Sequence, residues 1–143
     1  MRFERLKFEH LAQMAEIEKE AFDKPWTVNM FIPELASDDA HYLVGVESDE
    51  VVCYGGFHKI FDEGHIMNIA VKKEYRGQGL GRQLVSAMIA RAKLLGINNV
   101  TLEVSAENPV ALKLYDEYGF KSYGLRPKYY ENGSDAVIMW KEI

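Results

Sequence analysis

Apolar side chains recur at helical spacing in two segments of the chain, His10–Phe22 and Gly79–Leu95, and Thr27 is placed to cap another helix through about Leu35. Gly79–Leu95 has the clearest pattern, because Leu80 and Leu84 begin a stripe that continues along one face. Asn108 is placed to cap a further helix whose first position is Pro109, where a missing N–H costs no hydrogen bond. The predicted helices are His10–Phe22, Thr27 to about Leu35, Gly79–Leu95 and Asn108–Tyr118.

Segments rich in β-branched and aromatic residues lie between these helices. The polar stretch Glu47–Glu50 separates two of them and predicts a hairpin, and residues 131–135 predict a turn between the last two. The predicted strands are Phe3–Phe8, Tyr42–Val46, Val51–Ile60, Gly64–Val71, Asn99–Val104, Lys121–Tyr130 and Ala136–Lys141. The order β-α-α-β-β-β-α-β-α-β-β predicts one domain of the α/β (α+β) class over residues 1–143.

Composition narrows the chemistry that such a domain could perform. The 143 residues carry a formal net charge of −5, which argues against nucleic acid as the main ligand. The lone Cys53 cannot form an internal disulfide, and the four histidines show no metal spacing, so no metal is expected. Neither a membrane-spanning run nor a signal peptide is evident, so we expect a cytoplasmic protein without a membrane partner. The sequence leaves the oligomeric state open.

A glycine-rich segment follows the predicted strand that ends at Val71. Gly77, Gly79 and Gly81 alternate with other residues just before the strongest predicted helix. Glycines allow tight turns and close approach of a ligand, and a helix start offers free N–H groups and a partial positive charge. A simple strand-to-helix turn needs one glycine, so three of them favour a cradle for pyrophosphate.

Two other phosphate-binding loops fit this segment less well. A Walker A loop would need Gly-Lys-Ser/Thr at the helix start, and this is absent. The dinucleotide pattern Gly-x-Gly-x-x-Gly begins at Gly79 and Gly81, but Leu84 occupies its third glycine position. Glu103 does lie at about the distance along the chain that a ribose contact requires, so dinucleotide binding stays open as an alternative.

Two motifs resemble those of the GNAT acetyltransferases. Arg76–Gly81 matches Gln/Arg-x-x-Gly-x-Gly/Ala, and Asn108–Phe120 matches Asn-x-x-Ala-x-x-Leu-Tyr-x-x-x-Gly-Phe, in the same order along the chain. The resemblance implies the GNAT fold, with a central mixed, mostly antiparallel sheet of about seven strands flanked by about four helices. It also implies acetyl-CoA as the cosubstrate.

Further segments resemble the RimI family of bacterial ribosomal-protein alanine N-acetyltransferases. They are Leu102–Val104, Pro25–Trp26, Arg126–Tyr130 and Asp135–Met139, and the likeness covers nearly the whole chain. One departure is Ser134, where that family often carries an acidic residue. The resemblance implies that the acceptor is a protein N-terminus, in particular the N-terminal alanine of the small-subunit ribosomal protein S18.

The resemblance also implies a role for individual residues. It gives Glu103 as the general base and Tyr115 as the general acid that protonates the departing CoA sulfur. The residues that it implies for acetyl-CoA binding are Ile69, Ala70 and Val71 through their backbone, the loop residues Arg76, Gly77, Gln78, Gly79, Leu80, Gly81 and Arg82, and Asn108 and Tyr115.

The residues themselves are also compatible with purely structural roles. Glu103 stands in an apolar strand whose faces alternate, so it could simply point to solvent. Tyr115 could be a core tyrosine, and Asn108 could cap its helix instead of binding the pantetheine arm. The aromatic residues Trp26, Tyr129 and Tyr130 could line a peptide cleft or could serve packing alone.

Acetylation of a protein N-terminus is the leading hypothesis for function. Freeing an α-amine of pKa near 8 at pH 7 costs about 1 kcal/mol, whereas freeing a lysine near 10.4 costs about 4 to 5 kcal/mol, and a carboxylate base suits the first task better. Acetylation of a small-molecule amine or a lysine on the same fold is the alternative. A regulator that binds acyl-CoA without turnover is a third, which a missing acid or base would favour.

Overall fold

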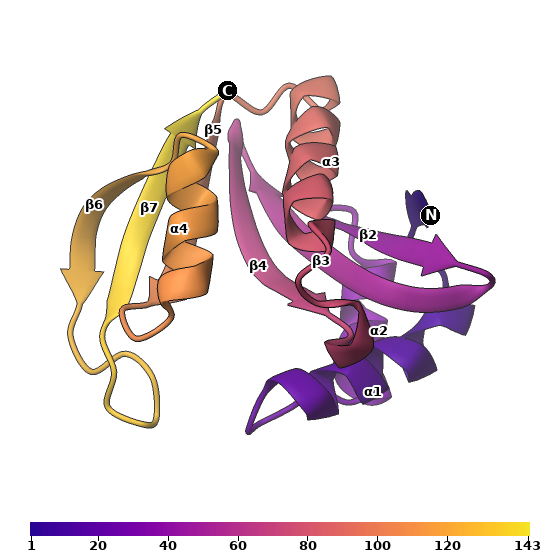
Figure 1. Cartoon of the computed structure of the whole chain (residues 1–143). Helices are drawn as coiled ribbons and strands as arrows, with labels where there is room; N and C mark the ends of the chain where they lie inside the picture. Colours follow the sequence, from indigo (N-terminus) through magenta and orange to yellow (C-terminus); the bar gives the residue numbers. More distant parts are fainter.

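The computed structural model describes all residues from 1 to 143, and Figure 1 shows a twisted sheet with helices on both faces. The helices are α1 (Leu11–Ala21), α2 (Val28–Ala36), α3 (Leu80–Leu94) and α4 (Pro109–Glu117). The strands are β1 (Arg2–Arg5), β2 (Ala40–Glu47), β3 (Glu50–Ile60), β4 (Glu63–Val71), β5 (Asn99–Ser105), β6 (Lys121–Arg126) and β7 (Ala136–Glu142). No helix is both long enough and apolar enough to span a membrane.

The seven strands form one sheet in the order β1-β2-β3-β4-β5-β7-β6. Every neighbouring pair is antiparallel except β4 and β5, which are parallel. The mixed, mostly antiparallel sheet with four α-helices confirms the architecture that the family resemblance implied. The last strand of the chain, β7, lies inside the sheet between β5 and β6.

Each face of the sheet carries its own hydrophobic core. The stripe predicted for α3 is confirmed, because Leu80, Leu84 and Met88 are buried in one cluster with Tyr115 of α4. The other cluster joins α1 and α2 to the opposite face, and its buried members are Leu11, Met14, Ile17, Phe31, Tyr42, Val44, Val46, Val51, Tyr54 and Ala70. Helices α3 and α4 therefore share one face, and α1 and α2 cover the other.

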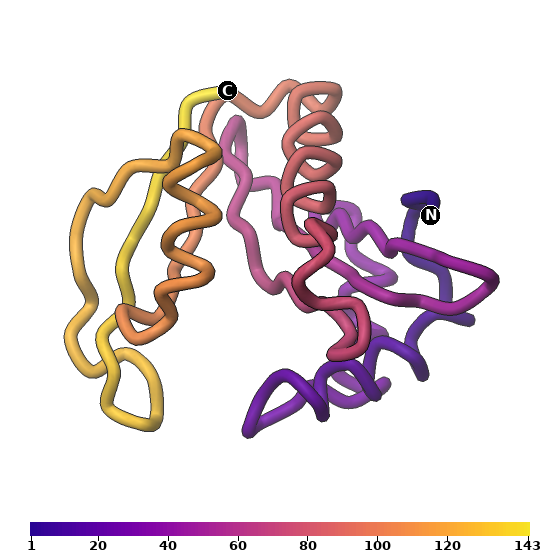
Figure 2. Tube along the Cα trace, viewed as in Figure 1, coloured from indigo at the N-terminus to yellow at the C-terminus, as the bar shows by residue number.

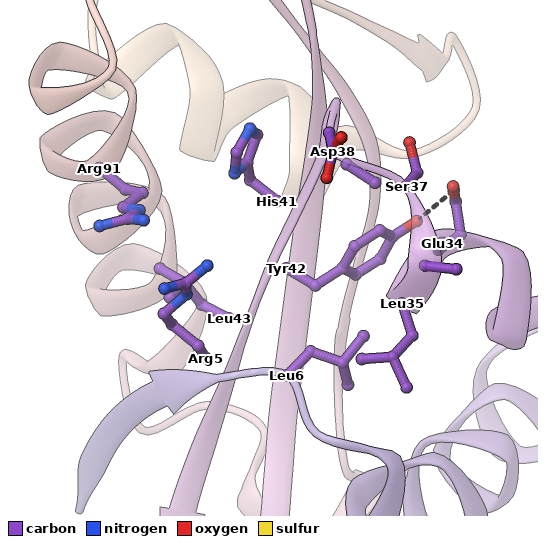
Figure 3. A pocket seen from close by; sticks show the side chains of 12 residues that line it. Arg5, Leu6, Glu34, Leu35, Ser37, Asp38, His41, Tyr42, Leu43 and Arg91 are labelled. Atoms are coloured by element: carbon purple, nitrogen blue, oxygen red, sulfur yellow. Dashed lines mark hydrogen bonds between the residues drawn. The ribbon is translucent and has the colours of Figure 1, made fainter.

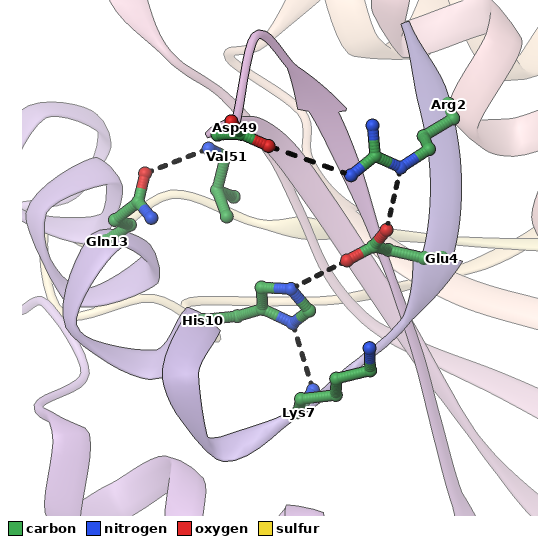
Figure 4. A network of polar contacts seen from close by, with 7 residues as sticks. All are labelled: Arg2, Glu4, Lys7, His10, Gln13, Asp49 and Val51. Carbon is green, nitrogen blue, oxygen red and sulfur yellow. Dashed lines mark hydrogen bonds and ion pairs between the residues drawn. The ribbon is translucent and has the colours of Figure 1, made fainter.

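The N-terminal strand is tied to α1 by a chain of polar contacts (Figure 4). The backbone N–H of Lys7 donates to His10 Nδ1 at 2.9 Å, so Nε2 carries the ring proton and donates to Glu4 Oε1 at 2.9 Å. Gln13 Oε1 accepts the backbone N–H of Val51 at 2.8 Å. These bonds fix where α1 begins and hold it against the turn between β2 and β3.

Two strands are longer in the prediction than in the structure. The predicted strand Phe3–Phe8 was wrong at its end, because β1 stops at Arg5 and Phe8–His10 form a short 3-10 helix that leads into α1. The other predicted strand ran from Lys121 to Tyr130, but β6 ends at Arg126. Pro127 has no N–H for a strand ladder, and Lys128 has a φ of +51°, in the left-handed region. The prediction was wrong at this end, and residues 127–130 belong to the loop between β6 and β7.

Candidate active site

Strands β4 and β5 separate along most of their length. They pair only between Glu63–His65 and Asn99–Thr101. The register between β3 and β4 passes from Gly56 opposite Asn68 to Phe57 opposite Ile66, which leaves a bulge in β4. The Cα trace shows the two strands diverging beyond the bulge (Figure 2).

The divergence leaves the end of β4 with an open edge. Ile69, Ala70 and Val71 pair with β3 on one side and have no strand on the other. Backbone groups on such an edge are free to bind an extended ligand. The expected backbone role of these three residues is therefore geometrically possible, and Ala70 is itself buried.

The glycine-rich segment forms a loop between β4 and α3 whose shape needs glycine. Gly77 and Gly79 have φ values of +79° and +81°, and a side chain at either would meet only open space. None of the backbone N–H groups of residues 77–82 donates to an acceptor within the protein. Such a run of free donors at a helix start is a cradle for an anion, and it fits a pyrophosphate.

The other residues predicted to bind the cosubstrate have structural partners as well. Arg76 Nε donates to the carbonyl of Val71 at 3.0 Å, and Arg82 forms an ion pair with Glu117 of α4. Gly81 lies against α4, because an added Cβ would be 3.5 Å from Leu114 Cδ2. These contacts hold the loop against β4 and α4. Leu80 is a core residue, and Gln78 is exposed at the tip of the loop.

Tyr115 projects from α4 into the core beneath the sheet. The residue is 7% exposed, and its ring lies 5.6 Å from that of Phe120. Burial and the neighbouring Tyr130 raise the pKa of Tyr115 well above its ordinary value near 10. The hydroxyl is therefore protonated at neutral pH and able to donate. The predicted cap is confirmed, because Asn108 Oδ1 accepts the N–H of Ala111 at 3.1 Å.

Glu103 lies in β5 and points away from the core on which Tyr115 packs. Its neighbours Leu102 and Val104 are buried in the α3 and α4 cluster, so the alternation of the strand turns Glu103 to the opposite face. Glu103 Oε1 lies 3.3 Å from Arg126 Nε at the end of β6. The base and the acid that we predicted thus approach from opposite faces of the sheet.

Tyr129 and Tyr130 influence the electrostatics of these two residues. The pKa of Tyr129 is raised, chiefly because its hydroxyl hydrogen-bonds to the Glu103 carboxylate. Burial raises the pKa of Tyr130, and the charges of Tyr129 and Glu103 add to this. Because Tyr130 also raises the pKa of Tyr115, it lies within electrostatic reach of both predicted catalytic residues. The two tyrosine rings pack edge to face with centroids 5.0 Å apart.

Trp26 lies in the loop between α1 and α2, on the other side of the diverging strands. Its ring packs 5.2 Å from that of Phe31, and its backbone N–H donates to Glu18 Oε1 at 2.9 Å. An ion pair between Lys24 and Glu131 joins this loop to the loop between β6 and β7. The loops that carry Trp26 and Tyr130 are therefore linked by one exposed ion pair.

Three residues of this region had no role in the sequence analysis. Arg126 was named only as part of a matching segment, and its contact with Glu103 depends on the strand order. Glu18 did give a signal, because it is a charged residue on the apolar stripe of the first predicted helix. Ser134, the departure from the family pattern, is buried and donates to Asn132 Oδ1 at 2.7 Å.

A cavity of about 230 Å³ lies elsewhere, at the open edge of β2 beyond the end of β1 (Figure 3). Arg5, His41 and Arg91 line one side of it, and Glu34 and Asp38 line the other. No residue predicted for the active site contacts this cavity.

Comparisons with known proteins agree with this geometry. The model of the family described as "Acetyltransferase (GNAT) family" matches residues 11–120. A protein of Bacillus subtilis (strain 168), provisionally named as a ribosomal protein bS18-alanine N-acetyltransferase, is 38% identical over 140 residues, which cover 96% of this chain and 93% of that protein. The enzyme of that name from Escherichia coli (strain K12) is 30% identical over 126 residues, covering 86% of this chain and 84% of its own length.

The fold of this chain is also similar to that of solved structures. The crystal structure of the ribosomal-protein-S18-alanine N-acetyltransferase from Escherichia coli superposes with a TM-score of 0.92 at 29% identity, covering 99% of this chain and 93% of that one. The similarity therefore extends through the diverging strands and the loops around them.

Proposed function

Because the chain belongs to the GNAT acetyltransferase family and is an N-acetyltransferase, we propose that it transfers the acetyl group of acetyl-CoA to the N-terminal α-amine of a protein. The proposed target is the N-terminal alanine of the small-subunit ribosomal protein S18, which would place the enzyme in the cytoplasm. The observation that carries this choice is the similarity, over almost the whole chain, to proteins named for that reaction.

The cosubstrate is held by backbone groups in this proposal. The free N–H groups of residues 77–82 bind the pyrophosphate at the start of α3. The open edge of Ile69–Val71 binds the pantetheine arm, and a backbone N–H there polarises the thioester carbonyl. Asn108 uses its Oδ1 for the helix cap, so its amide NH₂ remains available to the pantetheine. Acetyl-CoA supplies the activated acetyl group.

Glu103 acts as the general base. The acceptor arrives as an ammonium, and Glu103 is the carboxylate that faces away from the core beside the diverging strands. It removes the proton directly or through one water, after which the neutral amine attacks the thioester carbon. An α-amine, with a pKa near 8, demands only about 1 kcal/mol from this step at pH 7.

Tyr115 acts as the general acid. Its raised pKa keeps the hydroxyl protonated at neutral pH, so the proton is available to the leaving group. As the amide bond forms and the carbon–sulfur bond breaks, Tyr115 donates its proton to the departing sulfur. Tyr130, which is in electrostatic reach of both residues, lines the acceptor side together with Tyr129 and Trp26.

The experiment is to incubate the protein with acetyl-CoA and a peptide that begins with alanine, and to weigh the product. The control is the same peptide with a blocked N-terminus and an internal lysine. We expect acetylation of the free N-terminus only. Equal reaction of the blocked peptide would make the chain a lysine or small-amine acetyltransferase, and acetyl-CoA binding without turnover of either peptide would make it a regulator.

A further inference from the structure

Glu18 is a buried carboxylate that the proposed reaction does not use. It lies in α1, is 1% exposed, and is surrounded by the apolar cluster that includes Met14, Ile17 and Phe31. No basic side chain pairs with it. Burying a carboxylate without a cation is costly, so the hydrogen bonds that Glu18 accepts must offset that cost. What Glu18 contributes therefore depends on the two groups that donate to it.

The two oxygens of Glu18 bind two different parts of the molecule. Oε1 accepts the backbone N–H of Trp26 at 2.9 Å, and Oε2 accepts the hydroxyl of Tyr54 in β3. Across residues 23–26 of the loop between α1 and α2, the bond from Trp26 to Glu18 is the only hydrogen bond made by the backbone. The loop thus depends on this carboxylate for its backbone order.

The contacts close into a ring. Trp26 packs on Phe31 at 5.2 Å, Phe31 packs on Tyr54 at 5.8 Å, and Tyr54 returns to Glu18. Tyr54 also lies directly opposite Ala70 in the pairing of β3 with β4. Glu18 therefore links the loop on the acceptor side to the strand whose open edge faces the acetyl group.

We propose that Glu18 is a positioning residue that holds Trp26 and its loop at a fixed place relative to β4, and so sets the affinity for the acceptor peptide. The inference rests on the proposed function, in which Trp26 lines the peptide cleft. Glu18 contacts neither reactant, so its effect should be confined to the acceptor. Acetyl-CoA is held in the proposed function by backbone groups of β4 and of the loop 77–82, none of which bonds to Glu18, so its binding should change little.

Two substitutions separate positioning from packing. Glu18→Leu keeps the volume but removes both acceptors. Glu18→Gln keeps an oxygen for the Trp26 N–H and offers an amide donor to the Tyr54 oxygen. We expect the KM for the peptide to rise at least about 10-fold in Glu18→Leu, the scale of a lost hydrogen bond to a charged group, and to stay within about twofold of the wild type in Glu18→Gln. The KM for acetyl-CoA should not change in either variant.

Amide exchange at Trp26 gives a second measurement that needs no turnover. The Trp26 N–H should exchange faster in Glu18→Leu than in the wild type, and Glu18→Gln should restore its protection. Tyr54→Phe removes only the bond from β3 and keeps the bond to Trp26, so it should raise the peptide KM less than Glu18→Leu does and should leave the Trp26 N–H protected. An unchanged peptide KM in Glu18→Leu, or equal changes in both KM values, would overturn the inference.

A failure of the proposed function would give a different result from a failure of the inference about Glu18. If the wild type acetylates only a lysine or a small amine, the N-terminal assignment is wrong. The KM for that acceptor is then measured in the same variants. We still expect it to rise in Glu18→Leu and to stay near the wild-type value in Glu18→Gln.

Discussion

The Oε1 atom of Glu103 lies 3.3 Å from Nε of Arg126, so the side chain proposed as the base is already paired with a cation. The two residues come from β5 and β6, with β7 between them. The Arg126 side chain is 56% exposed and that of Glu103 is 32% exposed, and pairs open to solvent contribute about 0 to 1 kcal/mol. A substrate ammonium can therefore replace the guanidinium at little cost.

Arg126→Ala should consequently lower the KM for the peptide, because it removes a competitor for Glu103. The change should be no more than about fivefold, the equivalent of 1 kcal/mol, and should shrink as salt screens the charges. Steady-state kinetics at low and high ionic strength would measure it. Lys128→Ala removes the same charge two residues along and should have little effect. A rise in KM would mean that Arg126 orients the carboxylate instead.

Glu103→Gln should slow the reaction most at low pH. The substitution keeps the shape of the side chain but removes its basicity, while the α-amine deprotonates on its own as the pH approaches 8. The defect in kcat/KM should therefore be largest near pH 6 and should shrink toward pH 9. A pH–rate profile of both proteins with an alanine-starting peptide would test this. A defect of equal size at every pH would show that the carboxylate only positions the peptide.

Tyr115→Phe should lower kcat on the order of 100-fold and leave acetyl-CoA affinity unchanged, because it deletes one proton donor and keeps the ring. Single-turnover kinetics would measure the chemical step, and calorimetry the affinity. Tyr118→Phe is a matched control at the C-cap of the same helix, since that hydroxyl donates to the carbonyl of Arg82 at 2.8 Å and serves structure. Wild-type turnover in Tyr115→Phe would leave Tyr115 a packing residue.

The periodic parts of the sequence predicted the fold well. The stripe in α3 and the cap at Asn108 follow from local rules of spacing and hydrogen bonding, and the structure has both. The end of β6 was missed although Pro127 was a visible warning, because the run of β-forming residues on both sides outweighed it. The left-handed conformation of Lys128 has no marker in the sequence.

The contacts of the candidate site were harder to predict than its residues. The meeting of Glu103 with Arg126 requires that β7, the last strand, lie between β5 and β6, and no local pattern encodes that order. Arg82 was predicted to bind the cosubstrate, and its ion pair with Glu117 arises from the packing of α3 on α4. Glu18 was visible as a charge on an apolar stripe, but its partners lie in a loop and in a distant strand.

The stability of the protein should respond to the charge on Glu18. Burial raises the pKa of Glu18 above its ordinary value near 4.5, so the folded state holds this proton to a higher pH than the unfolded state. The stability that the proton supplies is present below the unfolded pKa and is lost as pH rises through the folded pKa. Glu18→Gln cannot ionise, so its free energy of unfolding should increase relative to that of the wild type as the pH rises above the ordinary glutamate pKa near 4.5.

Urea denaturation at several pH values would measure this difference. Glu16→Gln is the matched control, because Glu16 lies in the same helix, is exposed, and pairs only with Lys19 at 3.1 Å. Its difference from the wild type should vary little over the same range. A difference for Glu18→Gln that does not depend on pH would mean that Glu18 titrates alike in the folded and unfolded protein.

Gly79→Glu should weaken acetyl-CoA binding steeply without unfolding the protein. Gly79 has a φ of +81° with open space where a side chain would go, so the substitution strains the backbone modestly but places bulk and negative charge among the free N–H groups of residues 77–82. Gly96→Glu is the control that separates backbone strain from loss of the anion site. Gly96 has a φ of +77° and equally open surroundings, but it lies beyond the other end of α3. The two variants should lose similar stability in thermal unfolding, and only Gly79→Glu should lose affinity in calorimetry with acetyl-CoA. If both bind as the wild type does, the pyrophosphate does not lie at the start of α3.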